Sequence, residues 1–310
     1  MSSRVQAPPL TAELVSAGYD KQWIEYFGAV GVAILLYDYL LTFDLEITYI
    51  WRSAWTPIKV LYLCTRYIPF ADTAVMVLYR DFLSGSSDRA CYTAMGAATW
   101  MYAIGMSLAE IILLLRTWAI WGRNRWVGVG LIIHAAATFG GVAYSTNSYV
   151  SSTAFSPSPA PQIRGCFITN GSNILYIDWL LLMIMEFVYI TLISVKAHGF
   201  FVQGRNITFM YRALLEDGVL YFMILFSLSL VNFVMELTPV GSIGTTTMLA
   251  TPLRVIHSVL SARIVLHIRQ VGAQGSGGNS HSTSVVESII FDNLRSGDRV
   301  ESGPTTACPR

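Results

Sequence analysis

Charged residues are scarce in this chain, and their scarcity excludes an ordinary soluble fold. Aspartate, glutamate, lysine and arginine make up 13% of the 310 residues, whereas 54% are hydrophobic and the mean hydropathy is +0.52. Average soluble domains carry about 25% charged residues. Acidic and basic residues nearly cancel, to a net charge of +1, so no field of one sign is present to recruit nucleic acid.

Motifs for catalysis, cofactors and metals are also lacking. The chain has no phosphate-binding loop, no HExxH and no GxSxG sequence. Its four cysteines match no zinc or CxxC spacing, and its five histidines have no ligand spacing. All lysines lie at span ends or in tails, which argues against the retinal Schiff base of a rhodopsin. We therefore expect no cofactor and no metal. No constellation for catalysis is present, and an intramembrane enzyme that uses scattered acids remains the alternative to a protein without enzyme activity.

Long apolar runs are what the sequence does have. A helix of about 20 apolar residues crosses the ~30 Å hydrocarbon core of a bilayer. Residues 91–126 illustrate the pattern, because an apolar run rich in small residues ends there in Arg116, Arg123 and Arg125 with tryptophans between them. The runs predict an all-α polytopic membrane protein with seven transmembrane helices. Their approximate ranges are 23–43, 57–79, 91–118, 127–150, 174–195, 218–237 and 245–265.

These runs divide the chain into three parts. Residues 1–21 predict a short extracytoplasmic tail, which lacks the apolar core of a cleavable signal peptide. Residues 22–267 predict a seven-helix membrane domain. Residues 268–310 are rich in glycine, serine and other polar residues, and we expect a disordered cytoplasmic tail there.

The distribution of basic residues favours an N-terminus outside and a C-terminus in the cytoplasm. Cytoplasmic loops carry an excess of Lys and Arg near span ends. With this orientation the inner side holds about twice as many basic residues as the outer side. The inner set is Arg52, Lys59, Arg116, Arg123, Arg125, Lys196, Arg205, Arg212, Arg263 and Arg269, and the outer set is Arg4, Lys21, Arg80, Arg89 and Arg164.

A cysteine pair and a glycosylation sequence agree with that orientation. Cys91 opens the third span and Cys166 lies in the loop after the fourth, so both fall on the predicted outer face. Asn170-Gly-Ser, an N-glycosylation acceptor sequence, lies beside Cys166. Disulfides and glycans both form on the oxidising lumenal side. We expect a Cys91–Cys166 disulfide and a glycan on Asn170; the alternative is two unrelated cysteines and a chance sequon.

Among the charged residues inside the predicted spans, five lie near the middle or the inner part and predict a buried polar layer toward the cytoplasmic side: Asp38, Arg66, Glu110, Glu186 and Arg254. A charge at bilayer depth is costly and rarely persists without a partner or a water-filled site. We expect Arg66 to pair with Asp38 or Glu110, and Arg254 to pair with Glu186. Such a layer has three interpretations: a static connection between helices, a switch that breaks when helices move, or a path for protons or ions.

A second polar group lies nearer the predicted outer ends of the spans. It comprises Asp72, Asp178, Glu236, Trp100 and Trp179. Aromatic walls with a few polar groups are typical of a small-ligand site, and these residues predict a candidate outer cavity. The same residue types also form interfacial belts, so a belt remains the alternative.

Residues 37–72 resemble the N-terminal signature of a family of seven-span membrane proteins from mushroom-forming (basidiomycete) fungi, which carry domain of unknown function 6533. The resemblance rests on Tyr37-Asp38-Tyr39, Thr42-Phe43-Asp44-Leu45-Glu46-Ile47, Trp51, Trp55, Lys59 and Arg66-Tyr67 before Pro69. It implies membrane residence and no functional residues. The predicted layout is also loosely similar to G-protein-coupled receptors, although no Asp/Glu-Arg-Tyr triplet stands at Arg116 and no Asn-Pro-x-x-Tyr sequence stands in the last span.

Three functions fit these features. The leading hypothesis is a receptor-like sensor, which would contact a cytoplasmic signalling protein through its inner loops. The alternative is a small-molecule or proton-coupled transporter that uses the same acids, and a structural membrane protein is the third. The expected surroundings are the lipid bilayer of the plasma membrane or of a secretory-pathway membrane, with no nucleic acid and no assigned ligand.

Overall fold

The computed structural model describes residues 12–77, 88–156, 167–170, 172–202, 209–237 and 249–275. These residues form seven long α-helices, and the predicted all-α architecture is interrupted only by one small pair of strands. The helices are α1 (Ala12–Glu46), α2 (Pro57–Val77), α3 (Asp88–Ile120), α4 (Arg125–Ser152), α5 (Tyr176–Val202), α6 (Phe209–Leu237) and α8 (Ala250–Gly275). The shorter elements are the π-helical turn η1 (Ile47–Trp51), the 3-10 turn η3 (Asn173–Leu175) and the strands β1 (Ala154–Ser156) and β2 (Phe167–Asn170).

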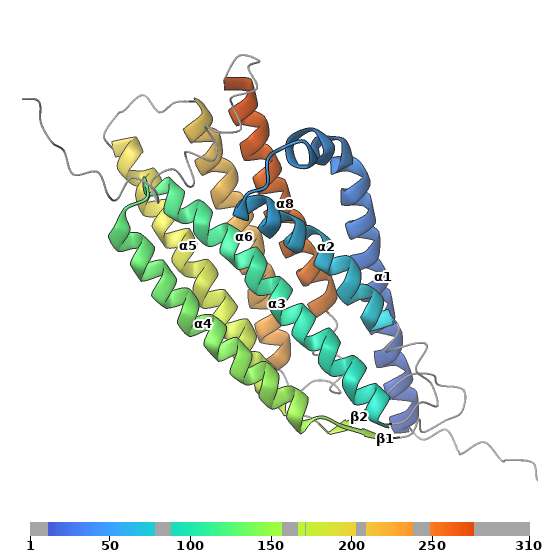
Figure 1. Ribbon diagram of the computed structural model, residues 1–310. Helices are drawn as coiled ribbons and strands as arrows, with labels where there is room; N and C mark the ends of the chain where they lie inside the picture. The colour runs from blue at the N-terminus through green and yellow to red at the C-terminus, as the bar shows by residue number, and fades with distance from the viewer. Residues whose placement is uncertain are drawn as a thin grey trace, which may run out of the picture.

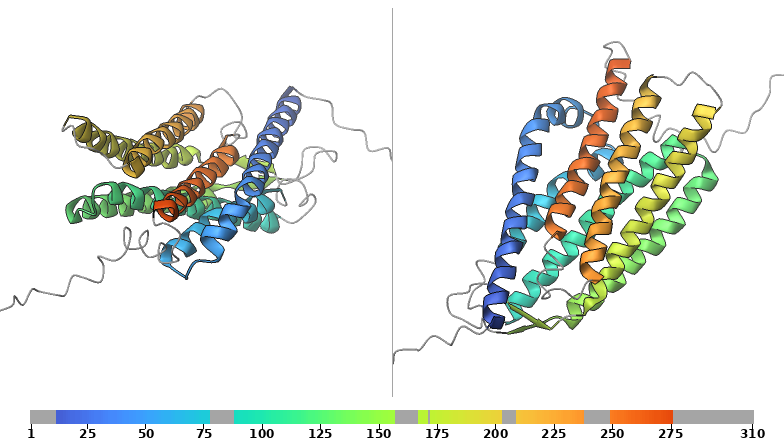
Figure 2. Two further views of the ribbon diagram at one scale, coloured as in Figure 1. Left: turned by 90° about the horizontal axis from the view of Figure 1, so that it is seen from above. Right: turned by 180° about the vertical axis from the view of Figure 1, so that it is seen from behind.

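The helices run side by side as a bundle, alternating in direction (Figure 1). Strands β1 and β2 pair antiparallel at one end of the bundle, where α1 begins; we call it the hairpin end. Turn η1 lies at the opposite end, where α8 finishes; we call it the π-turn end. Seen from behind, α8 lies between α1 and α6 (Figure 2).

Six of the helices are long and apolar enough to cross a membrane. They are α1 to α6, with candidate spans Gln22–Trp51, Pro57–Val77, Arg89–Ile120, Arg125–Ser152, Tyr176–Gly199 and Val219–Leu237. Large apolar side chains also face outward on these helices; Leu40 is 76% exposed, and Ile132 and Ile133 are more than 60% exposed. An apolar outer surface on apolar helices is what a lipid environment requires, and the molecule has the architecture of a polytopic helical membrane protein.

Helix α8 is the one long helix among the described residues that does not meet the criterion for a span. It contacts α1, α2, α3 and α6. Along residues 250–270 every side chain except Arg263 is buried or half-buried. Because neighbouring helices rather than lipid surround it, α8 tolerates the polar residues that lower its hydropathy.

Several element boundaries differ from the predicted ones. Helix α1 begins at Ala12, inside the predicted tail, and with η1 it continues to Trp51 through residues expected to form a loop. Helix α8 begins at Ala250 and extends to Gly275, past the predicted boundary at residue 268. Residues 276–310, the rest of the predicted disordered tail, lie outside the described residues.

Local sequence signals account for several helix ends. Pro57 occupies the first position of α2, and Thr56 Oγ1 accepts a hydrogen bond from Lys59 N at 3.2 Å, as an N-cap does. Asn124 caps α4 by accepting a hydrogen bond from Trp126 N at 2.9 Å. Between α3 and α4, Gly122 and Arg123 adopt positive φ angles of 60° and 57°, which end α3 in a tight turn.

Candidate functional site

The most heavily connected buried group is the guanidinium of Arg66 on α2. It donates hydrogen bonds to the Asp38 carboxylate and to Thr42 Oγ1, both on α1. Its Nε also lies 3.5 Å from Glu46 Oε2. Arg66 and Glu46 are fully buried and Asp38 nearly so, so each charge is removed from solvent but has an opposite charge beside it.

The Arg66–Asp38 pair confirms one of the two predicted partners. A second cation joins it, because Arg263 Nε on α8 lies 2.6 Å from the other oxygen of Asp38. Glu46 accepts further hydrogen bonds from Tyr67 Oη at 2.7 Å and from Trp51 Nε1 at 3.1 Å. We call these residues on α1, η1, α2 and α8 the Arg66 network. Glu46 was assigned to a loop in the sequence analysis and was therefore missed.

Two basic side chains hold the π-helical turn η1 in place. Lys59 Nζ on α2 donates to Trp51 O at 3.2 Å and to Ser53 O at 2.8 Å. Arg269 Nη1 on α8 donates to Tyr49 O at 2.7 Å and to Ser53 Oγ at 2.9 Å. Helix ends and π-turns leave backbone carbonyls without helical partners, and these cations satisfy them.

Arg254 on α8 contacts Asp72 on α2 rather than Glu186, which corrects the predicted pairing. Arg254 Nε lies 3.3 Å from Asp72 Oδ2, and both side chains are buried. The prediction placed Arg254 in the inner half of its span, but α8 begins at Ala250, so Arg254 lies in the second turn from the hairpin end. Asp72 lies one turn from the end of α2, at the same end of the bundle.

Glu186 instead belongs to a second buried cluster, with Glu110 and His257. His257 Nδ1 lies 3.5 Å from Glu110 Oε1, and His257 Nε2 lies 3.2 Å from Glu186 Oε1. The three residues come from α3, α5 and α8, and each is at most 2% exposed. No local spacing connects them in the sequence, so sequence analysis did not group His257 with the two glutamates. We call them the Glu–His–Glu cluster.

A cavity of about 170 Å³ extends from the hairpin end of the bundle down to Glu110. Asp178 in the first turn of α5, Tyr149 near the end of α4 and Glu236 near the end of α6 line its upper part. Glu110 and Met185 lie deeper. The complete lining is Met76, Met95, Thr99, Tyr102, Ala103, Met106, Ser107, Glu110, Thr138, Phe139, Val142, Thr146, Tyr149, Leu175, Asp178, Trp179, Leu182, Met185, Glu236, Ala250 and Thr251.

The lining contains part of the group predicted for an outer cavity. Asp178, Glu236 and Trp179 are present, whereas Asp72 and Trp100 are not. Asp72 forms an ion pair with Arg254 instead, and Trp100 packs in a neighbouring apolar cluster with Met95 and Tyr149. The Asp178 carboxylate accepts a hydrogen bond from Ser145 on α4, which fixes its orientation at the cavity wall.

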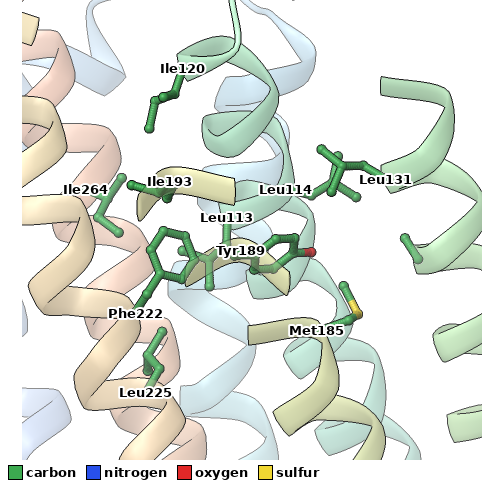
Figure 3. Packing of buried hydrophobic residues seen from close by; sticks show 11 residues of the cluster. Leu113, Leu114, Ile120, Leu131, Met185, Tyr189, Ile193, Phe222, Leu225 and Ile264 are labelled. Carbon is green, nitrogen blue, oxygen red and sulfur yellow. The ribbon is translucent and has the colours of Figure 1, made fainter. Parts of the chain in front are cut away.

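Below the cavity the bundle is closed by a tightly packed apolar cluster. Figure 3 shows the aromatic rings of Tyr189 and Phe222 beside each other, with Met185 and Leu225 nearby. The ring centroids of Tyr189 and Phe222 are 5.6 Å apart. Met185 both lines the cavity and belongs to this cluster, so the cavity ends where the cluster begins.

The predicted disulfide and glycan involve residues that the structure describes only in part. Cys91 is buried near the start of α3 and is not a free thiol, whereas Cys64 is free. Cys166 lies outside the described residues, and of Asn170 only the backbone, in β2, is described. The Cys91–Cys166 bond and the glycan therefore stay predictions.

The fold defines the class of this protein, an integral membrane protein of several helices. Residues 26–71 match the model of a Family of unknown function (DUF6533), which confirms the predicted domain of unknown function 6533. No curated protein matches the chain. The matched segment runs from α1 through η1 into α2, and it contains Asp38, Glu46 and Arg66 with most of their partners. What the family match covers is thus the Arg66 network rather than the cavity.

Proposed function

We propose that this protein is a receptor-like sensor with seven membrane spans, an outer N-terminus and a cytoplasmic C-terminus. Helix α8 is the seventh span in this proposal, supported by its enclosure among other helices. The hairpin end is then outside, with Cys91 and Asn170. The π-turn end is in the cytoplasm, where Lys59, Arg263 and Arg269 fit the expected excess of basic residues.

The single observation that carries the proposal is the blind cavity that faces the hairpin end. Its volume, about 170 Å³, is close to that of an apolar protein cavity known to hold one benzene molecule, roughly 150 Å³. Its walls are mostly apolar and aromatic, with a few polar groups, as in small-ligand sites. The packed cluster beneath it separates it from the cytoplasmic end, which suits a binding site better than an open path.

The charges of the lining indicate the class of ligand. Three carboxylates, from Glu110, Asp178 and Glu236, line the cavity, and no lysine, arginine or histidine is among its described lining residues. Trp179, Tyr102 and Tyr149 supply aromatic faces, which attract cations. A small organic cation with an apolar body is therefore the ligand that this cavity favours.

Helix α8 provides a physical route for a response. Its His257 contacts Glu110 at the cavity floor, its Arg254 contacts α2 and its Arg263 contacts α1. At the π-turn end its Arg269 contacts η1. A ligand that binds one position of α8 better than another would shift the population of these contacts, and a cytoplasmic signalling protein at the π-turn end would read that shift.

The ligand class can be tested with three probes of one size and different charge. Purified full-length protein is titrated with benzylamine, benzyl alcohol and benzoate, and the shift of the melting temperature is measured. Benzylamine should stabilise the protein saturably, and benzoate should not. Asp178→Asn should weaken benzylamine binding at least tenfold, because a hydrogen bond to a charged group contributes about 1.5–3 kcal/mol.

Asp44→Asn is the matched control, because Asp44 is an exposed carboxylate on α1 outside the cavity. It should leave the benzylamine affinity unchanged. Equal binding of benzoate and benzylamine, or an unchanged affinity in Asp178→Asn, would refute the cation site.

A transporter remains the second candidate. His257 lies between Glu110, at the cavity floor, and Glu186, which is outside the cavity, and this arrangement resembles a proton relay. The two functions separate in two assays. Heterotrimeric G-protein subunits that co-purify through the C-terminal tail, and are lost on adding a non-hydrolysable GTP analogue, would support the sensor. Benzylamine uptake into proteoliposomes that follows a pH gradient and disappears in Glu186→Gln would support the transporter.

A further inference from the structure

We infer that Glu110, Glu186 and His257 form a binding site for one divalent transition-metal ion of the Zn²⁺ type. The inference does not depend on the proposed sensor function. One nitrogen of His257 and one oxygen of each glutamate lie within 4.8 Å of one another. Imidazole nitrogen and carboxylate oxygen are both ligands of zinc.

The three donor atoms lie close enough together for one ion to reach an atom of each residue. Zinc binds nitrogen and oxygen at about 2.0–2.2 Å, so two donors at a tetrahedral angle are about 3.4 Å apart. The imidazole nitrogens of His257 lie 3.5 Å from Glu110 Oε1 and 3.2 Å from Glu186 Oε1. The two carboxylates face opposite nitrogens of the ring, and a single ion binds only one of these nitrogens. For all three residues to be ligands, the carboxylate at the other nitrogen must turn toward the ion, across the 4.8 Å within which the three donor atoms lie.

The donor atoms are buried and are not used by the protein itself. Glu186 and His257 are 0% exposed and Glu110 is 2% exposed. Among the described residues, the Glu110 carboxylate and the ring nitrogens of His257 form no hydrogen bond, and the Glu186 carboxylate has only the Ser229 hydroxyl beside it apart from His257. Leaving buried polar groups without hydrogen bonds is costly, and a native structure that keeps them has a reason for doing so.

The charge balance favours a dication. Arg254, the nearest arginine along α8, already faces Asp72, so that pair is neutral. Two glutamates that are both ionised beside a neutral imidazole would leave two negative charges in the interior. One divalent ion would neutralise both carboxylates and would also bind the nitrogen and oxygen atoms that could serve as its ligands. Two bound protons would neutralise the carboxylates but would leave the His257 nitrogen without a ligand role. Proton binding is the competing outcome of the experiment below.

The cavity supplies an entry path. Glu110 lines the cavity floor, whereas Glu186 and His257 do not, so an ion arriving through the cavity meets Glu110 first. An entry path, suitable ligands and donor spacing are the features required of an inferred metal site. Water or another small molecule in the cavity would complete the coordination beside Glu110.

The test measures metal binding by the purified full-length protein. The protein is stripped with a chelator, equilibrated with Zn²⁺ and desalted, and bound zinc is counted by mass spectrometry. Co²⁺ replaces Zn²⁺ in a second sample, because its visible absorption reports the coordination geometry. We expect about one ion per chain, with affinity reduced at least tenfold in His257→Ala, Glu110→Gln and Glu186→Gln.

His134→Gln is the matched control, because His134 is a half-buried histidine on α4 that lies outside the cluster. It should retain the ion. If His257→Ala fails to fold, the test relies on Glu110→Gln and Glu186→Gln, which nearly preserve the shape of the side chain. The metal site would be overturned if the native chain retained no more zinc than the cluster variants, or if His134→Gln lost as much zinc as they do. Proton binding by the two glutamates would then be the remaining explanation. The benzylamine titration is scored separately, on Asp178→Asn, so either proposal can fail alone.

Discussion

Gly105 on α3 leaves the space that the guanidinium of Arg254 on α8 occupies. A Cβ atom at position 105 would lie 1.9 Å from Arg254 Nη2 and 2.6 Å from Arg254 Cζ. Arg254 is 1% exposed and faces Asp72, so its side chain has little room in which to retreat. The glycine is thus part of the arrangement that lets α8 place a charge beside α2.

Replacing Gly105 by alanine should destabilise the protein. Displacing Arg254 leaves Asp72 as a buried charge without its partner, and breaking a buried pair costs about 3–5 kcal/mol. The measurement is the melting temperature of the protein in detergent, with the yield of folded protein beside it. Gly130→Ala is the control, because a Cβ there meets nothing within 4 Å; it should be neutral or stabilise slightly, since alanine favours helix by about 1 kcal/mol.

The Arg66 network should depend on arginine and not only on positive charge. Arg66 donates to Asp38 and Thr42 at once and lies beside Glu46, and the compact ammonium of lysine does not reproduce that geometry. Arg66→Lys and Arg66→Met should both lower stability strongly, by about 3 kcal/mol or more for the unpaired acids. Arg263→Ala removes the second arginine that contacts the Asp38 carboxylate, and this arginine is partly exposed.

Arg263 is 43% exposed, and partly exposed ion pairs contribute only about 1 kcal/mol or less. Its removal should therefore have a small effect on the melting temperature. An Arg263→Ala variant as unstable as Arg66→Met would show that the pairing of Asp38 depends on both arginines equally, contrary to this prediction.

Lys59→Met should loosen the π-turn without unfolding the bundle. The substitution keeps the apolar stem and removes the hydrogen bonds to Trp51 O and Ser53 O. Hydrogen exchange of residues 47–53 should accelerate about tenfold, which corresponds to about 1.4 kcal/mol of local stability. Exchange in α5, which is remote from Lys59, is the internal reference and should not change.

Cys91 and Cys166 should behave as one unit. Cys91→Ser, Cys166→Ser and the double variant should lower the melting temperature by the same amount, because either single change breaks the same bond. Cys64→Ser should be nearly neutral, since Cys64 is a free thiol. Peptide mapping without reduction should recover the 91–166 cross-link, and an additive effect of the two single variants would contradict it.

Glycosylation should report the orientation of the bundle. Asn170→Gln should abolish a mobility shift on deglycosylation if the hairpin end is lumenal. A second acceptor sequence, Asn206-Ile-Thr, lies in the predicted cytoplasmic loop between the fifth and sixth spans, so Asn206→Gln should change nothing. The reverse pattern would invert the proposed topology.

The spans and one ion pair were within reach of sequence analysis, because both follow from local composition. Apolar runs predict helices. A buried arginine at the same depth as a buried aspartate is expected to form an ion pair with it, as Arg66 does with Asp38. Glu46 falls in the predicted loop because the first apolar run ends at residue 43. The helix continues through it because Arg66, Tyr67 and Trp51 satisfy its carboxylate.

The remaining contacts depend on distances that a linear sequence does not contain. The prediction pairs Arg254 with Glu186 because their estimated depths in the bilayer are similar. Helix α8 begins a few residues later than the predicted span, so Arg254 lies nearer the hairpin end and contacts Asp72. The Glu–His–Glu cluster draws one residue from each of three helices, so no spacing marks it. Gly105 matters because it has no side chain, and the reason becomes visible only when the position of the Arg254 guanidinium is known.

The polarity of α8 also imposes an order on biogenesis. An arginine at the centre of an inserting helix costs about 2.5–3.5 kcal/mol on the translocon scale, and α8 carries Arg254, His257 and Arg263. The carboxylates that receive these side chains lie on α1, α2, α3 and α5, which are synthesised earlier. Helices α1 to α6 have the apolarity to partition on their own. In the proposed seven-span topology, helix α8 would be recruited by helices already in the bilayer, and a defect at Asp38 or Asp72 should first appear as a C-terminal helix left outside the membrane.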